Sequence, residues 1–184
     1  MTGMPGAGKS TVAQALIKND DFILINMGDC VREEVSRRNL ELTDKNLGSL
    51  MLELREKMGQ GAIANLIVDK IKKDYTFNFK FVIDGVRSIH EIEVLKNLGT
   101  VKILAIHASL PTRFDHLKLR SRSDAPSSMT DCVSRDKREL SVGVSEAIAF
   151  ADEMISNNDI TIDELCTISK SIVQKWLNKD TKKY

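Results

Sequence analysis

The stretch that decides the fold is MTGMPGAGKST, residues Met1 to Thr11. It contains the pattern G-x-x-x-x-G-K-S between Gly3 and Ser10. Glycines let such a loop turn its backbone N–H groups toward phosphate oxygens, and the helix behind it presents its positive end to them. The residues that we expect to bind the phosphates of ATP are Gly3, Met4, Pro5, Gly6, Ala7, Gly8, Lys9, Ser10 and Thr11.

Two side chains of this loop carry the chemistry. The Lys9 ammonium is predicted to neutralise the β and γ phosphates and to act in catalysis, and the Ser10 hydroxyl is predicted to bind Mg²⁺. A helix is expected over Lys9 to Lys18. Four fixed positions followed directly by a helix disfavour the alternative of a chance glycine-rich turn. The implied donor is ATP and the implied cofactor is Mg²⁺.

Only Met1 and Thr2 precede the loop, although such a loop normally follows a buried β-strand. That strand is central in the sheet and bonded on both sides, so its omission would expose the backbone edges of two neighbours. We therefore expect the chain to be a fragment, or a sequence whose start has been placed too far downstream, with the first strand truncated.

Composition narrows the classes of protein. A chain of 184 residues fits one domain. With 27 basic and 26 acidic residues, anions must bind at local clusters, which disfavours bulk nucleic-acid binding. Three widely separated cysteines without C-x-x-C spacing favour a reducing compartment. No apolar run reaches the ~20 residues that span a bilayer, and no secretory signal is present. A cytoplasmic protein without membrane contact is expected.

Short apolar runs alternate with helical patterns, which is typical of an α/β fold with a parallel sheet. Strands are predicted at 22–26, 79–83, 101–106 and 153–156. Helices are predicted after Thr43 as N-cap, after Gly61, and after the capping box 161–164. The polar segment 121–130, SRSDAPSSMT, is predicted to be a mobile loop.

Two motifs place a carboxylate and an arginine after predicted strands. The first is MGDCVREE at 27–34, and the second is DGVRS at 84–88. Ligands of open α/β sheets bind at the carboxyl ends of the strands, so both motifs are candidate parts of one site. The alternatives are exposed surface arginines and, for Asp84, a helix N-cap.

These motifs resemble those of a known group. INMGDCVR is similar to the acceptor-binding T-G-D-x-L-R of adenylate kinases, and VIDGVRS to their D-G-F-P-R-T with one residue deleted. The chain resembles the archaeal adenylate-kinase-like family of unassigned function, which is related to dephospho-CoA kinase. The resemblance spans Met1 to about Leu165 and includes RDKRELSVG and ADEMISN. It implies a three-layer P-loop NTPase fold of the nucleoside monophosphate kinase type, as one domain over 1–184.

The resemblance also implies roles for individual residues. An acceptor-binding helical region is expected at about 28–73 and a small lid at about 120–135. Arg32 and Arg87 match arginines that clamp the acceptor's phosphate, a task that suits the planar guanidinium because it can bond two phosphate oxygens. Asp29 matches an acceptor-binding carboxylate. Asp84 matches a carboxylate near the metal, so Ser10 and Asp84 form the expected metal site.

The resemblance also implies that arginines in and near the lid bind the phosphates. Arg120 and Arg122 match arginines at the base of the lid, and Arg135 matches an arginine beyond it. Arg122 and Arg135 are therefore predicted to stabilise the transition state with Lys9. His116 and Ala125 depart from the family pattern, in which an arginine and an aspartate are common.

Two further residues are interpreted individually. Glu91 falls where adenylate kinases read adenine with glutamine, and a carboxylate does not donate hydrogen bonds, so AMP recognition is not inherited. The alternative is a solvated helix residue. Arg138 beside Glu139 is interpreted as part of an ordinary solvated helix.

The predicted function is a small-molecule kinase that transfers the γ-phosphoryl group of Mg-ATP to a nucleoside monophosphate or a similar phosphate-bearing acceptor. Two alternatives stay open. One is phosphorylation of a hydroxyl, as in dephospho-CoA kinase, with Asp29 or Asp84 accepting the proton. The other is a nucleotide-binding regulatory protein with weak ATPase activity.

Overall fold

The computed structural model describes residues 1–18, 22–75, 79–120 and 125–180. The helices are α1 (Lys9–Ile17), α2 (Met27–Arg37), α3 (Asp44–Met58), α4 (Ala62–Asp74), α5 (Ile89–Lys96), α6 (Leu110–Leu119), α7 (Met129–Ser141), α8 (Val144–Ala149) and α9 (Ile162–Asp180). The strands are β1 (Phe22–Asn26), β2 (Lys80–Asp84), β3 (Leu104–His107) and β4 (Glu153–Ser156).

The strands form two parallel pairs, β1 with β2 and β3 with β4. β1 and β4 have the predicted bounds. β2 is shifted by one residue, so Asp84 ends the strand instead of following it. β3 begins three residues later than predicted. The backbone N–H of Ile103 donates to the Asp152 carboxylate at 2.7 Å, whereas in a strand it would donate to the backbone carbonyl of a neighbouring strand.

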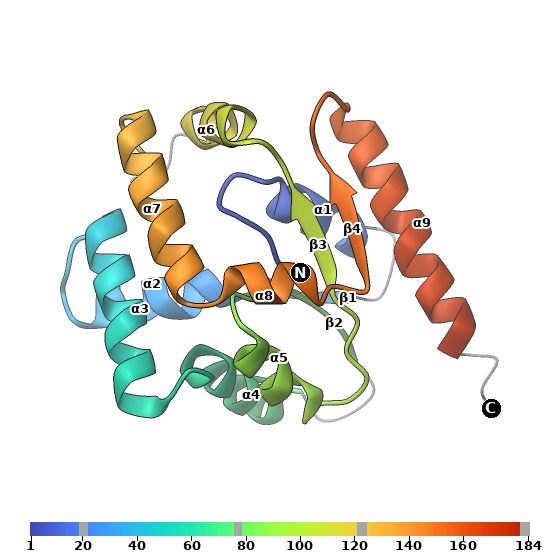
Figure 1. Cartoon of the computed structure of the whole chain (residues 1–184). Coiled ribbons are helices and arrows are strands. Elements are labelled where there is room, and N and C mark those ends of the chain that lie inside the picture. The colour runs from blue at the N-terminus through green and yellow to red at the C-terminus, as the bar shows by residue number, and fades with distance from the viewer. Residues whose placement is uncertain (19–21, 76–78, 121–124, 181–184) are drawn as a thin grey trace.

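Met1 and Thr2 lie between the two strand pairs (Figure 1). The N–H of Thr2 donates to Leu104 O, and Ile106 N–H donates to Thr2 O, both at 3.0 Å. On the other side, the N–H groups of Gly85 and Val86 donate to Met1 O at 3.2 and 3.1 Å. Thr2 therefore pairs in parallel with both neighbours, and it places the phosphate loop at the carboxyl ends of the strands.

Beside Met1, an apolar cavity of about 350 Å³ separates β2 from residues 101–104. Side chains of α5 and α9, among them Leu95 and Trp176, close its sides. The Met1 ammonium is buried and donates to Ile83 O. Burial lowers the pKa of this ammonium to about 6, against the opposing effect of Asp84.

Helices cover both faces of the strands. On one face α1 and α9 pack together, and Val12 and Leu165 contribute to a core with Val82 and Ile106. On the other face the apolar sides of α2, α3, α4, α5 and α8 form a second core. In Figure 1, α9 runs beside β4 and α4 lies against α5. The predicted three-layer α/β arrangement is confirmed.

Helix ends agree with the capping signals in most places. Thr43 caps α3, and the Thr161 and Glu164 side chains form the reciprocal bonds predicted at the start of α9. The predicted loop 121–130 is wrong at its end, because α7 begins at Met129. Ser128 and Asp131 form a capping box there, which satisfies the first N–H groups of the helix. No helix in the described ranges is long and apolar enough to span a bilayer.

Candidate active site

The loop between Met1 and α1 has the backbone that a phosphate-binding loop needs. Gly3, Gly6 and Gly8 all have positive φ angles. A Cβ on Gly3 would lie 2.2 Å from Ile106 O, and one on Gly6 would lie 2.5 Å from Arg113 O. Glycine is therefore required at both positions, by conformation and by the close approach of the backbone of β3 and α6.

Side chains from outside the loop hold its carbonyls. Arg113 Nη1 donates to Pro5 O at 3.1 Å, and the same guanidinium binds both oxygens of Asp136 at 2.8 and 2.6 Å. His116 Nδ1 lies 2.9 Å from Gly6 O, and Asn157 Nδ2 donates to Ala7 O at 3.0 Å. These contacts hold the carbonyls of Pro5, Gly6 and Ala7. Sequence reasoning missed Arg113, since an arginine in an amphipathic helix carries no loop-binding signature.

Lys9 reaches across the loop. Its Nζ donates to Gly3 O at 2.8 Å and to Met4 O at 3.0 Å, so two carbonyls hold the ammonium beside the pocket. Burial lowers the pKa of Lys9 to about 8, partly offset by the Asp84 carboxylate. Lys9 therefore carries its charge at neutral pH but loses it within the range of an ordinary pH titration.

This pKa predicts how nucleotide affinity varies with pH. Phosphate oxygens bind the charged form of Lys9, which predominates below pH 8 and is lost as the pH rises above it. The Kd for Mg-ADP should be nearly constant from pH 7 to 7.5, and above pH 8 it should rise by up to about tenfold per pH unit. Isothermal titration calorimetry measures it. A Lys9→Met protein should show no such rise, and a pH-independent Kd in the unmutated protein would contradict the prediction.

Ser10 and Asp84 meet at the base of the pocket. Ser10 Oγ donates to Asp84 Oδ2 at 3.2 Å. Asp84 is 3% exposed, and its Oδ1 has no hydrogen-bond partner among the described residues. A buried carboxylate oxygen without a donor fits a hard cation such as Mg²⁺. No group of three or more His, Cys, Asp or Glu side chains gathers in the described part of the chain, so phosphate and water oxygens would complete the coordination.

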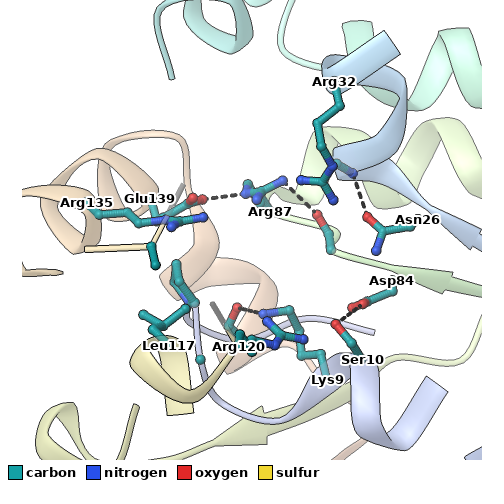
Figure 2. Close-up of a pocket in the computed structure, with 16 residues that line it drawn as sticks. Lys9, Ser10, Asn26, Arg32, Asp84, Arg87, Leu117, Arg120, Arg135 and Glu139 are labelled. Atoms are coloured by element: carbon teal, nitrogen blue, oxygen red, sulfur yellow. Dashed lines mark hydrogen bonds and ion pairs between the residues drawn. The ribbon is translucent and has the colours of Figure 1, made fainter. Parts of the chain in front are cut away.

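The predicted acceptor arginines line the same pocket as this loop. Figure 2 shows Arg32 and Arg87 on one side of the pocket and Lys9 and Ser10 below them. Arg32 binds Asp29 at 2.8 Å on the same helix. Asp29 is 58% exposed and is not among the pocket-lining residues, so only Arg32 of this pair faces the pocket. Asn26, which sequence reasoning missed, also lines it at the end of β1.

Two carboxylates hold Arg87. The Nε of Arg87 donates to Glu139 of α7, and its Nη1 donates to Gly85 O at 3.3 Å. Its backbone N–H donates to Glu91 at 2.7 Å. Glu139, which sequence reasoning treated only as a neighbour of Arg138, is 3% exposed and lines the pocket.

Glu91 is neither solvated nor in contact with the pocket. Its side chain is fully buried and pairs with Arg55 of α3, whose side chain is 3% exposed. The two sequence-based alternatives, a base-reading residue and a solvated one, are therefore both wrong. The sequence around Glu91 did not indicate that Arg55 of α3 would form a buried ion pair with it.

The lid arginines are partly described. Arg120 and Arg135 line the pocket with Ala125, whereas Arg122 lies outside the described residues. Arg135 Nε lies 3.3 Å from Asp44, and Arg138 donates to the same carboxylate at 2.7 Å. Asp44 begins α3, so α7 is tied to the helical region next to the pocket. Arg138 is thus paired between elements, contrary to its interpretation as part of a solvated helix.

Of the nine loop residues predicted to bind ATP, five line the pocket: Gly3, Pro5, Gly6, Lys9 and Ser10. The sequence thus located one wall of the pocket and both arginines of the opposite wall. The side chains that hold these groups from α6 and α7 came only from the structure.

The fold and this pocket define a P-loop kinase-like protein. A shikimate kinase from Bacteroides thetaiotaomicron has a similar structure, with a TM-score of 0.60 at 14% identity, covering 94% of this chain and 96% of that one. TT1252 from Thermus thermophilus is similar with a TM-score of 0.58 at 17% identity, over 94% of both chains. These two likenesses concern the fold alone.

The chain belongs to the UPF0200 family. A UPF0200 protein of Pyrococcus abyssi is 40% identical over 162 residues, which is 86% of each chain. One from Methanocaldococcus jannaschii is 37% identical over 178 residues, covering 97% of this chain and 89% of that protein. The profile of a family described as AAA domain matches residues 2–133. The expected relationship to archaeal P-loop kinase-like proteins is confirmed.

Proposed function

We propose that this protein is a phosphotransferase that moves the γ-phosphoryl group of Mg-ATP to a nucleoside monophosphate or a similar phosphate-bearing acceptor. The observation that carries the proposal is the arrangement of one pocket. The phosphate loop with Lys9 and Ser10 forms one wall. Arg32, on α2 directly after β1, and Arg87, in the loop after β2, line the same pocket. Two anion-binding groups that face one pocket suit a donor and an acceptor that both carry phosphate.

Each wall has a distinct task in this proposal. The loop N–H groups and Lys9 bind the donor's phosphates, and Arg32 and Arg87 orient the acceptor's phosphate for in-line attack. Arg120 and Arg135 add positive charge around the transferred group, as would Arg122. An acceptor phosphate needs no strong general base.

Ser10 and Asp84 would hold Mg²⁺, which when bound neutralises charge on the donor phosphates. The atoms offered to the cation are the Ser10 hydroxyl, which donates to Asp84 Oδ2, and the Asp84 Oδ1, which has no hydrogen-bond partner among the described residues. The region 28–73 would provide the acceptor side and 120–135 the lid.

An acceptor screen tests this function directly. We expect ADP release from Mg-ATP to rise at least about tenfold above the acceptor-free rate with one of AMP, CMP, UMP or GMP. Dephospho-CoA and shikimate are included because the alternative function, phosphorylation of a hydroxyl, predicts turnover with an acceptor that carries a hydroxyl group. Shikimate is chosen because a protein named shikimate kinase has a similar fold. An equal, low rate with every compound would instead favour a nucleotide-binding regulatory protein.

A substitution of Arg87 separates the two walls. Arg87→Met should raise the KM for the acceptor about 10²-fold, since charge-assisted bonds to phosphate contribute roughly 1.5–3 kcal/mol, while the KM for ATP should change less than threefold. Steady-state kinetics with each substrate varied in turn measures both constants. Lys96→Met, an exposed change of the same charge on α5, is the control. Equal losses for both substrates would count against an acceptor role.

A further inference from the structure

Arg87 belongs to a series of four contacting charged residues whose signs alternate. Its members are Arg55, Glu91, Arg87 and Glu139, which we name the Arg87 network. The side chains of Arg55, Glu91 and Glu139 are 3%, 0% and 5% exposed, whereas that of Arg87 is 22% exposed. The network joins α3, α5 and α7 at the end of β2, and its formal charges sum to zero.

Stability alone does not explain this network. Removing charges from water costs several kcal/mol per ion, and buried pairs can often be replaced by apolar side chains without loss of stability. Two members, Arg87 and Glu139, line the pocket (Figure 2). A buried carboxylate in a pocket otherwise rich in cations needs a functional reason.

Glu139 occupies one of the guanidinium donors that Arg87 could offer to an incoming anion. It accepts from Arg87 Nε, and Nη1 is engaged by Gly85 O. Burial by itself would raise the pKa of Glu139, but the nearby charges of Arg87, Arg135 and Lys9 hold that pKa below its usual value. Glu139 is therefore an anion at neutral pH, bound to the arginine that we assign to the acceptor.

We propose that Glu139 is an internal anion that pairs with Arg87 in the unliganded protein and yields to the acceptor's phosphate, so that it selects doubly charged phosphate groups over weaker anions. A dianionic phosphate attracts the guanidinium more strongly than a carboxylate does, and it can bond Arg32 at the same time. A singly charged anion gains too little to displace Glu139. This inference rests on the proposed function for the role of Arg87.

The test uses Glu139→Gln, which removes the charge and keeps an oxygen that accepts from Arg87. The probe is inorganic phosphate, titrated by calorimetry into protein saturated with Mg-ADP so that the phosphate loop is already occupied. We expect phosphate to bind about tenfold more tightly to Glu139→Gln. Glu146→Gln, an exposed change of the same charge on α8, should leave the affinity unchanged. Unchanged or weaker binding in Glu139→Gln would overturn the proposal.

A double-mutant cycle shows whether Glu139 acts through Arg87. In an Arg87→Met background, Glu139→Gln should change the phosphate affinity less than twofold. A tenfold gain that persists in that background would mean that Glu139 only lowers the general potential of the pocket, and the pairing would then have no role in selection.

A measurement on the unmutated protein keeps the proposal testable if a variant fails to fold. The Arg87 Nε–H signal in a ¹⁵N-edited NMR spectrum should move when phosphate is added to the Mg-ADP complex, because its partner changes. A signal that stays in place while phosphate binds would contradict the exchange. Both readouts are binding measurements, so an inactive protein would refute the proposed function without deciding this inference.

Discussion

Lys9→Met is expected to reduce turnover by at least about 10³-fold and to weaken binding of Mg-ATP strongly. The removal of one preorganised hydrogen-bond donor to a charge that develops in the transition state lowers the rate about 10²–10³-fold. The Lys9 ammonium is in addition a full positive charge beside the phosphates, so its loss should have a larger effect. Its ammonium is already aimed by bonds of 2.8 and 3.0 Å to the loop carbonyls. Activity measured by ADP release, together with calorimetric titration of Mg-ATP, gives both effects.

The same substitution should not destabilise the unliganded fold. Burial lowers the pKa of Lys9 to about 8, below its unfolded value of 10.5. Below pH 8 the side chain is charged in both states, so the folded state bears the full cost of burying that charge, and the cost declines between pH 8 and 10.5. At pH 7, Lys9→Met should therefore melt at or above the temperature of the unmutated protein. Retained turnover in a folded variant would refute a role of Lys9 in transfer.

The sequence predicted the parts of the site that lie in continuous motifs. The phosphate loop, Asp84 and the two arginines after β1 and β2 were found because a parallel sheet brings the ends of its strands to one edge. Local signals also sufficed for the helix starts at Thr43 and Thr161, where one side chain satisfies nearby N–H groups. Each of these inferences needs only residues that are close together in the chain.

The parts that could not be predicted depend on pairs far apart in the chain. Glu139 lies 52 residues from Arg87, and Glu91 lies 36 residues from Arg55. Their helices show ordinary charged patterns, in which a buried glutamate looks the same as a solvated one. Only the packing of α7 and α3 against the end of β2 decides which carboxylates leave water and which cation each one meets.

An engineered strand in front of Met1 is expected to raise the melting temperature by roughly 5–15 °C. A methionine followed by four β-branched residues would extend parallel to β2 and fill the apolar cavity beside Met1. Burying four such side chains contributes about 6–12 kcal/mol. Ordering four residues costs about 4–8 kcal/mol. The midpoints of these two ranges leave ~3 kcal/mol, which corresponds to a shift within the stated range for a chain of this size.

The extension would also replace the buried Met1 ammonium with a neutral amide. Below pH 6 that ammonium is charged in the folded and the unfolded state, so its burial costs most there, and the cost falls as the pH rises from 6 to 8. An extension of the same length made of glycine and serine is the matched control, since it removes the ammonium but supplies no apolar side chains. Differential scanning calorimetry at pH 7 compares the three proteins. If both extensions shift the melting temperature equally, the gain comes from removal of the Met1 ammonium charge. That result would refute the claim that the apolar cavity beside β2 accepts an added strand.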